Sequence, residues 1–378
     1  MLSTFSSNLE PSKPALNEDT LLLSSVATNV ANEKIKHLNK SKEKKRILLL
    51  VDLYDWCFYN IAARIKKQLE STYIFDILTT VDFYNNINIV IRHPYDIYLF
   101  FYPSGAWLDT RKLQYLRMTG KRNRGVGSRI MFCMYDNYIW RPDIEVDERL
   151  KTQQNATYAN LDFYLKECAA YLWGSPKIRD NIYKFYKTIK PNASCMDGVD
   201  SKMFCFKEYS KDILTKNKLK IGWIGNSDIT INGLQKGYIE IKKYVTDLNE
   251  NFEFVPLDRQ IKLIPHHKVP EYIHNIDIIV CYSTCEGTPN QILEGSSCGR
   301  CWVSTDVGVV SAVYNTIENN PTGIIIKKNE SAFKSALMTL YNNRQLIIDY
   351  GKNGRKAIES KWDWKYRLEG FTRLFEQI

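Results

Sequence analysis

The sequence predicts an α/β protein made of two successive series of parallel strands and helices. Short apolar runs such as Arg46–Asp52 (RILLLVD) suit central strands that are buried on both faces. These runs alternate with segments of helical spacing, which is typical of parallel sheets covered by helices. A second series begins at Lys218, and 378 residues are too many for one ordinary core.

The first series starts with the strand at Arg46–Asp52 and a helix over Trp56–Leu69. Apolar residues recur along one face of this helix, at Ile61, Ala62, Ile65 and Leu69. Further strands are predicted at Tyr73–Leu78, Ile97–Tyr102, Ser128–Tyr135 and Tyr171–Gly174, and a helix follows through Tyr186.

The second series predicts a second sheet with its own helices. Its strands are expected at Lys218–Ile224, Glu253–Pro256, Asp277–Tyr282, Cys301–Thr305 and Gly323–Ile326. Its helices are expected at Gly237–Leu248, Val269–Ile276, Pro289–Ser297 and Glu330–Asn342. A last amphipathic helix is predicted over Trp362–Gln377, with Leu368, Phe371, Leu374 and Phe375 on one side.

The bulk composition predicts a cytoplasmic protein with an anionic partner. No apolar run approaches the roughly 20 residues of a membrane span, and no signal peptide is recognisable. Nine cysteines at irregular spacing suit reduced thiols. The net charge of +10 fits a phosphate-bearing substrate, a membrane surface or a nucleic acid, without choosing among them. Much of the excess lies in Lys40–Arg46 and Arg117–Arg129.

The segment Glu286–Glu294 (EGTPNQILE) is the strongest functional signal in the chain. It follows the predicted strand that ends at Tyr282, and Gly287 lets the backbone turn tightly. Thr288 is a preferred N-cap residue and Pro289 suits the first helical position. A helix is therefore expected to begin just past the carboxyl end of a strand, where open α/β sheets bind ligands.

This helix start predicts a site for a phosphate flanked by hydroxyl groups. The free N–H groups of Asn290 and Gln291, with the helix dipole, would hold an anion. Glu286 precedes the helix and Glu294 lies about one turn inside it, so both carboxylates can face one ligand. A carboxylate accepts two hydrogen bonds side by side, which suits the vicinal hydroxyls of a sugar or ribose. The pattern indicates a nucleotide-sugar.

Glu286 and Glu294, with seven residues between them, resemble the E-x7-E motif of the retaining glycosyltransferases of family 4. The similarity covers roughly Cys195 to the end of the chain. The other segments that resemble family motifs are Met196–Phe204 (MDGVDSKMF, like N-G-V-D-x-x-x-F), Gly225 with Lys236–Gly237 (like G-R-L…K-G), Gly295–Val303 (GSSCGRCWV) and Ser304–Gly308 (STDVG).

The resemblance implies the GT-B fold, with two Rossmann-like domains whose parallel sheets face each other across a cleft. We expect a flexible tail over residues 1–40, an acceptor-side domain over 41–205 and a nucleotide-sugar-binding domain over 206–361. The helix within 362–378 would then cross back to the first domain.

The resemblance also implies roles for the motif residues. Glu286 would contact the donor sugar as a catalytic residue, Glu294 would bind the ribose, and Lys236 would neutralise the diphosphate. Further donor contacts are implied at Gly225, Asn226, Gly287, Thr288, Pro289 and Asn290. The donor would be a UDP- or GDP-sugar acting as co-substrate, and no metal or other cofactor is expected. His266 and His267 are candidates for the edge of the base pocket.

Two departures from the family pattern affect these expectations. The Arg that follows the Gly in the family is Asn226 here, so Lys236 would have to suffice, alone or with help from Arg300 or Lys220. The histidine common in the family's first domain has no clear equivalent, and Asp136 is the nearest candidate for a catalytic or acceptor contact by position.

The acceptor and the reaction leave alternatives open. A glycan or lipid-linked glycan in surface polysaccharide synthesis is favoured, with possible peripheral binding to the inner membrane face. A modified nucleic-acid base is the alternative acceptor, because the basic loop at residues 117–129 could contact membrane or DNA phosphates. The rival from another class is a binding protein that recognises nucleotide-sugars without turnover, which the loss of the Arg at Asn226 keeps open.

Overall fold

The structure is a computed structural model of the whole chain. It describes residues 44–54, 57–86, 95–101, 129–135, 161, 165–166, 168–188, 190–227 and 235–378. Residues from Lys45 to Ile378 form one compact unit. The tail expected over residues 1–40 lies outside the described ranges.

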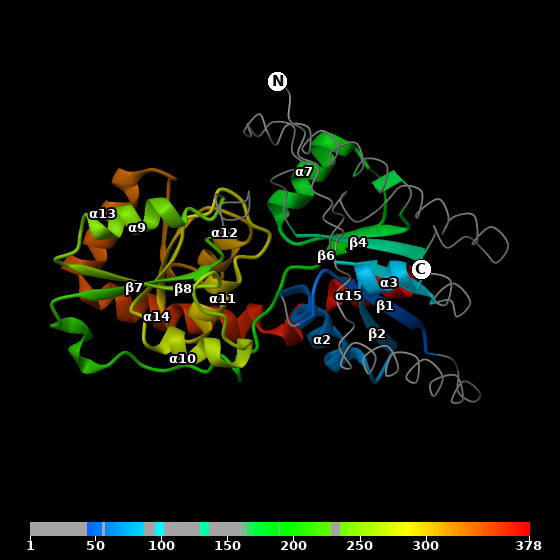
Figure 1. Cartoon of the computed structure of the whole chain (residues 1–378), viewed down its shortest axis with the longest axis horizontal. Helices are drawn as coiled ribbons and strands as arrows, with labels where there is room; N and C mark the ends of the chain where they lie inside the picture. Colours follow the sequence, from blue (N-terminus) through cyan, green and yellow to red (C-terminus); the bar gives the residue numbers. More distant parts are fainter. Residues whose placement is uncertain are drawn as a thin grey trace, which may run out of the picture. The chain divides into compact units, whose positions relative to one another are not determined.

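The first sheet has six parallel strands in the order β2-β1-β3-β4-β5-β6 (Figure 1). Its strands are β1 (Arg46–Val51), β2 (Ile74–Thr79), β3 (Ile97–Phe100), β4 (Ile130–Met134), β5 (Ala170–Trp173) and β6 (Asn192–Ser194). Central β1 is buried because alternate side chains enter two separate cores, as its continuous apolar sequence predicts.

Helices cover both faces of this sheet. α2 (Cys57–Leu69) and the last helix, α15 (Glu369–Gln377), pack in the core that contains Ile47 and Leu49. α3 (Thr80–Asn85) and α7 (Pro176–Tyr186) pack in the core that contains Leu48 and Leu50. The end of the chain therefore completes the core of a sheet whose first strand begins at Arg46.

The second sheet has five parallel strands in the order β11-β10-β9-β7-β8. Its strands are β7 (Leu219–Gly225), β8 (Phe252–Asp258), β9 (Ile278–Cys281), β10 (Cys301–Thr305) and β11 (Ile324–Ile326). α9 (Tyr238–Thr246) and α13 (Glu330–Asn342) pack against one face, and α10 (Val269–His274), α11 (Asn290–Ser297) and α12 (Val310–Tyr314) against the other. Figure 1 shows α9 and α13 on the opposite side of this sheet from α10 and α11.

Among the described residues, strand β6 and the helices α3, α12 and α14 were not predicted, and the terminal helix has other bounds than expected. α14 (Arg344–Ala357) was missed because Gly351 and Gly354 weaken the helical pattern. Both glycines are buried, and a Cβ on Gly351 would lie 2.2 Å from the carbonyl oxygen of Gly299, so close packing explains them. The terminal helix begins at Glu369, not at Trp362, because Asp363 is extended and caps a short 3₁₀ turn instead.

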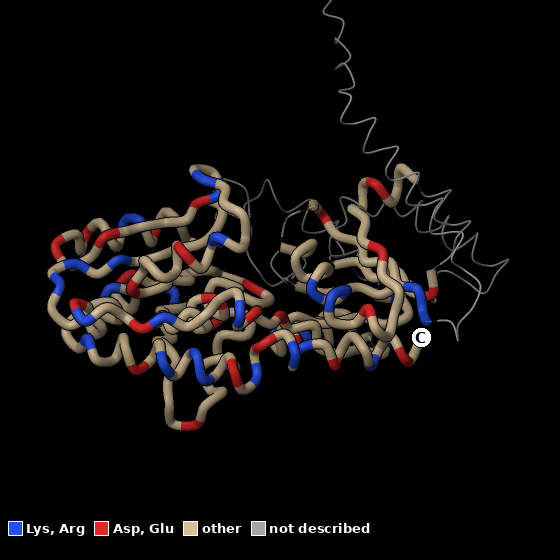
Figure 2. Tube along the Cα trace, turned by 90° about the horizontal axis from the view of Figure 1, so that it is seen from below, with Lys and Arg blue, Asp and Glu red and all other residues tan. Residues whose placement is uncertain are grey.

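Acidic and basic residues alternate along the described trace (Figure 2). Within the same part of the chain, no helix is both long and apolar enough to cross a membrane.

Candidate functional site

The segment between β9 and α11 forms the centre of the site. α11 begins at Asn290, and Pro289 is its N-cap residue without a side-chain capping bond. The prediction that Thr288 caps the helix is therefore wrong. The Thr288 hydroxyl donates to the carbonyl of Gly174 and accepts from the N–H of Asp197, both at 3.3 Å, so it is already satisfied elsewhere.

Glu286 forms a close ion pair with Lys236. The Lys236 Nζ lies 2.6 Å from Glu286 Oε1, and the Ser283 hydroxyl donates to the same oxygen at 2.8 Å. Burial opposes the charge of Lys236, but the Glu286 carboxylate outweighs it and raises the lysine pKa. Lys236 is therefore a fixed cation at the end of β9.

The position of Lys236 depends on the glycine that follows it. Gly237 has φ +67 and is the N-cap residue of α9. A Cβ on this residue would lie 2.7 Å from the carbonyl oxygen of Tyr282, the first residue after β9. Glycine permits both the left-handed backbone and the close approach that bring Lys236 to the strand end.

Glu294 is paired with His266, a contact that the sequence did not predict. His266 Nε2 lies 2.8 Å from Glu294 Oε1, and its ring centroid is 5.3 Å from that of Phe204. Burial lowers the pKa of His266, but the Glu294 carboxylate dominates and raises it. Glu294 itself is 9% exposed, so a ligand that reached its carboxylate would either displace His266 or bind beside it. His267 lies in the same 3₁₀ turn (His266–Lys268) before α10.

The carboxyl ends of β7 and β8 lie beside α11. The Gln291 side chain accepts a hydrogen bond from the N–H of Ile224 at 3.0 Å, and the N–H of Arg259 donates to Gly225 at the same distance. Asn226, which replaces the family's arginine, accepts a 2.6 Å hydrogen bond from Gln260. A neutral amide pair therefore occupies this part of the site.

The ends of β4 and β5 contact the loop that precedes α11. A Cβ on Gly287 would lie only 1.7 Å from the carbonyl oxygen of Tyr135, directly after β4. Gly308 (φ +52) approaches the Gly287 carbonyl in turn, where a Cβ would lie 2.1 Å from its oxygen. Lys177 Nζ pairs with Asp306 at 2.8 Å nearby. The two sheets are thus joined directly at Gly287.

Asp197 is a site residue that sequence reasoning missed. It follows β6, it is only 2% exposed, and it stands where the similar family pattern has Asn. Burial raises its pKa to about 7, although contacts with the Tyr135 and Asn290 side chains favour the ionised form. The nearby Glu294 charge raises the pKa further. The substitution of an acid for Asn within Met196–Phe204 was the available signal.

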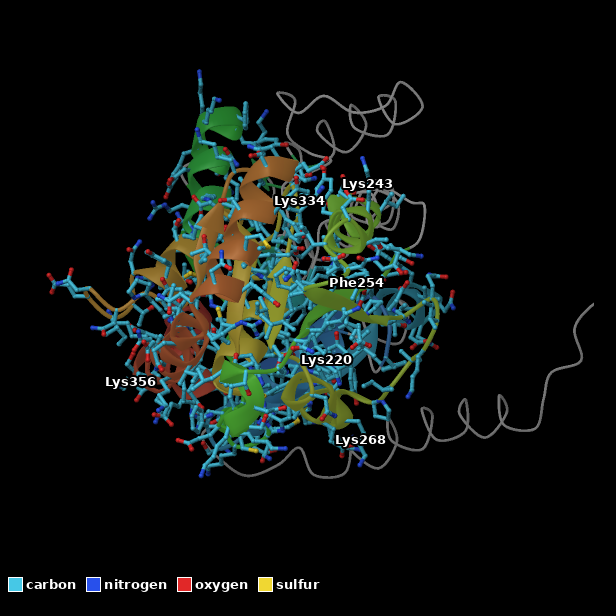
Figure 3. All side chains as sticks on the ribbon, turned by 90° about the vertical axis from the view of Figure 1, so that its left-hand side faces the viewer. Lys220, Lys243, Phe254, Lys268, Lys334 and Lys356 are labelled. Atoms are coloured by element: carbon cyan, nitrogen blue, oxygen red, sulfur yellow. The ribbon has the colours of Figure 1, made fainter. Side chains whose placement is uncertain are left out.

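Two expected contributors to the site, Arg300 and Lys220, lie elsewhere. The Arg300 guanidinium is buried and donates to four backbone carbonyls, those of Lys207, His274, Cys298 and Gly299, so it is not available to a phosphate. Lys220 is the second residue of β7, at the opposite end of the strand from Gly225, and Figure 3 shows it apart from Lys243 and Lys334. Asp136 lies outside the described residues.

The basic loop is also largely outside the described ranges, which exclude residues 102–128. Its last residue, Arg129, donates to the carbonyl of Tyr95 at 3.3 Å. Where the structure is described, no group of three or more His, Cys, Asp or Glu side chains could hold a metal ion.

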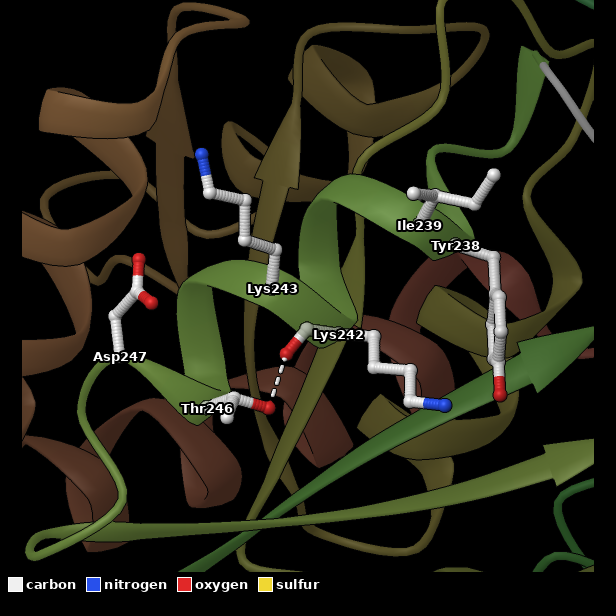
Figure 4. Close-up of a pocket in the computed structure, with 6 residues that line it drawn as sticks. All are labelled: Tyr238, Ile239, Lys242, Lys243, Thr246 and Asp247. Atoms are coloured by element: carbon white, nitrogen blue, oxygen red, sulfur yellow. Dashed lines mark hydrogen bonds between the residues drawn. The ribbon is translucent and has the colours of Figure 1, made fainter.

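A depression of about 440 Å³ lies on the outer surface of α9 and does not coincide with the site. Its lining comes from one helix and its C-cap, namely Tyr238, Ile239, Lys242, Lys243, Thr246 and Asp247 (Figure 4). Thr246 bonds back to the carbonyl of Lys242 at 2.7 Å. The motif residues Lys236, Glu286 and Glu294 are not part of it.

A family of known proteins matches part of the chain. Residues 223–343 match the family described as glycosyl transferases group 1, and this range contains Lys236, Glu286 and Glu294. No curated protein sequence matches the chain.

Solved structures show the same fold over most of the chain. Sucrose-phosphate synthase from Thermosynechococcus elongatus matches with a TM-score of 0.64 and 12% identity, over 88% of this chain and 99% of that one. HepE from Anabaena in complex with UDP and glucose matches at 0.60 and 11%, over 88% and 100%. The catalytic domain of starch synthase IV from Arabidopsis thaliana, bound to ADP and acarbose, matches at 0.64 and 10%, over 89% and 99%. The predicted GT-B fold is confirmed.

Proposed function

We propose that this chain is a glycosyltransferase that takes its sugar from a UDP- or GDP-sugar, with retention at the anomeric carbon. The observation that carries the proposal is the Lys236–Glu286 ion pair at the end of β9, next to the first turn of α11. Both residues lie in the range that matches glycosyl transferases group 1. HepE, which has a similar fold, was solved with UDP-glucose, which supports a nucleotide-sugar as donor.

The local chemistry suits departure of a nucleoside diphosphate. When the bond between the anomeric carbon and the phosphate oxygen breaks, negative charge develops on the diphosphate. Lys236 and the free N–H groups at the start of α11 are fixed positive groups that would stabilise this charge. The proposal includes no metal ion and no other cofactor.

The two glutamates would bind the hydroxyl-bearing ends of the donor. Glu286 now binds Lys236 and Ser283 through one oxygen, Oε1, and its other oxygen would accept from a sugar hydroxyl. Glu294, held by His266, would accept from the ribose. Gly225, Asn226 and the loop from Gly287 to Asn290 would complete the donor site through backbone and amide groups.

The acceptor would approach from the ends of β4 and β5, which contact Gly287. Asp136 directly follows Tyr135 and is our candidate for the acceptor or catalytic contact on that side. We propose a glycan or lipid-linked glycan as the acceptor class, in a cytoplasmic setting that allows peripheral binding to an anionic membrane.

Donor hydrolysis tests the proposal. We expect the full chain to release UDP or GDP from one member of a nucleotide-sugar panel, and Glu286→Ala to reduce this release at least about 100-fold, as for loss of other electrostatic contacts to a transition state. Glu253→Ala is the matched control, since Glu253 is exposed on β8. Equal release by the wild type and Glu286→Ala would refute the catalytic role.

Donor binding separates the enzyme from a non-catalytic binding protein. The amide pair of Asn226 and Gln260 lacks the charge of an arginine, which is the observation that favours binding without turnover. Lys236→Ala should weaken UDP or GDP binding at least about tenfold, while Lys242→Ala, on the outer surface of α9, should leave it unchanged. Binding without any release of nucleotide would identify the binding protein.

A further inference from the structure

We propose that Asp197 is a positioning residue that acts in its neutral, protonated form and holds the start of α11 ready for the donor diphosphate. The inference rests on the proposed function, because the start of α11 is the proposed phosphate site. Asp197 lies outside the segment Glu286–Glu294, and its protonation would set how the site responds to pH.

Asp197 lies where three segments meet. Its N–H donates to the Thr288 hydroxyl at 3.3 Å, and that hydroxyl donates to the carbonyl of Gly174 after β5. Its carboxyl is in contact with the side chains of Asn290, the first residue of α11, and Tyr135, after β4. Asp197 therefore links the first sheet to the helix that would bind phosphate.

The Asp197 carboxyl lacks the full set of hydrogen bonds that a buried anion needs. Oδ1 of Asp197 and the hydroxyl of Tyr135 are both buried without a well-formed hydrogen bond among the described residues. A buried carboxylate with an unsatisfied oxygen is costly, whereas a protonated carboxyl is neutral and gains an O–H donor. The arrangement consequently suits the protonated state at and below neutral pH.

The titratable groups around Asp197 favour the same state. Burial raises the pKa of Tyr135 and of Cys133 on β4, so both groups stay protonated. The negative charge of Glu294 on α11 opposes a second negative charge at Asp197 and raises its pKa.

Ionisation of Asp197 would compete directly with the donor. A carboxylate beside Asn290 would interact with the positive N-terminal end of α11 and would repel a diphosphate from it. The neutral carboxyl leaves that end of the helix available. Donor affinity should therefore be constant below about pH 7 and fall by up to about tenfold per pH unit above it, because only the protonated fraction binds.

Isothermal titration of the full chain with UDP-glucose and GDP-glucose, from about pH 6 to about pH 9, tests this profile. Asp197→Asn keeps the shape but cannot ionise, so its Kd should stay near the low-pH wild-type value throughout. Asp212→Asn removes an exposed acid outside the site and should retain the wild-type slope. A flat wild-type profile, or a slope retained in Asp197→Asn, would overturn the inference.

A second variant keeps the test decisive if Asp197→Asn does not fold. The Tyr135 hydroxyl favours the ionised form, so Tyr135→Phe should move the midpoint of the affinity loss to higher pH. An unchanged midpoint would contradict the proposal. Failure of every protein to bind either donor, or any other member of the nucleotide-sugar panel, at any pH would instead refute the proposed function, and the inference with it.

Discussion

Asp197→Asn also predicts a pH-dependent gain in stability. The pKa of Asp197 is about 7 in the folded protein and about 3.8 when exposed, so the folded state keeps a proton that the unfolded state releases. Stability is therefore lost as the pH rises from about 4 to about 7 and changes no further above that. Asparagine stays neutral in both states and has no such loss.

The magnitude follows from the pKa difference. Each pKa unit corresponds to about 1.4 kcal/mol, so the full loss in the wild type is about 4 kcal/mol at pH 7.5 and about 2 kcal/mol at pH 5. Asp197→Asn should exceed the wild type in free energy of unfolding by roughly these amounts. The burial of Asp197, at 2% exposure, makes solvent screening a small correction.

Urea unfolding at both pH values, followed by tryptophan fluorescence, measures the difference. The gain of Asp197→Asn over the wild type should be about 2 kcal/mol larger at pH 7.5 than at pH 5. A gain that is the same at both pH values would show that Asp197 does not titrate as described. Asp212→Asn removes an exposed acid and keeps Asp197. Its free energy of unfolding should therefore differ from that of the wild type by the same amount at both pH values.

Three further substitutions test individual contacts. Gly287→Ala would place a Cβ 1.7 Å from the Tyr135 carbonyl oxygen. We expect it to lower the free energy of unfolding in urea by about 1–3 kcal/mol and to weaken donor binding. Unchanged stability and unchanged donor affinity would contradict the contact. His266→Ala removes the side chain that holds Glu294 in place, so the Kd for UDP should rise several-fold in titration calorimetry. An unchanged Kd would show that His266 does not contribute to the site. Arg300→Lys loses hydrogen bonds to buried carbonyls and should lower the free energy of unfolding by about 3 kcal/mol without changing the Kd for UDP. A loss of donor binding without a loss of stability would indicate that Arg300 does contact the phosphate.

Gly295→Ala is the control for the first of these substitutions. Its Cβ would meet only the end of a flexible side chain, Ile279 Cγ1, at 3.0 Å. It lies inside α11, where alanine is the better helix former. We expect a change in stability smaller than that of Gly287→Ala.

The sheets were predictable because buried parallel strands have continuous apolar sequences. β10 is found at its predicted bounds, and β1 and β9 differ from theirs by one or two residues. α14 was missed because its glycines allow close packing, of Gly351 against Gly299 and of Gly354 against Ser296, and these are contacts between distant parts of the chain. Local propensity cannot show such a contact.

The candidate site was predictable only where its residues lie near each other along the sequence. The helix start beyond β9 could be predicted from the order Gly287, Thr288, Pro289, although the N-cap is Pro289 and not Thr288. The pairing of Glu294 with His266, 28 residues away, required the folded chain. The same holds for Asp197, whose carboxyl becomes unusual only when β4 and α11 enclose it.

The placement of α15 has a consequence for biosynthesis. Phe371, Leu374 and Phe375 complete the core of the first sheet, and Lys45 Nζ binds the carbonyl of Phe375 at 2.7 Å. A ribosome makes these residues after every strand of both sheets, whereas domains commonly fold in the order of their synthesis. The first sheet therefore has to keep one apolar face uncovered until α15 has been translated. A nascent or truncated chain that lacks this helix exposes that face to chaperones and proteases.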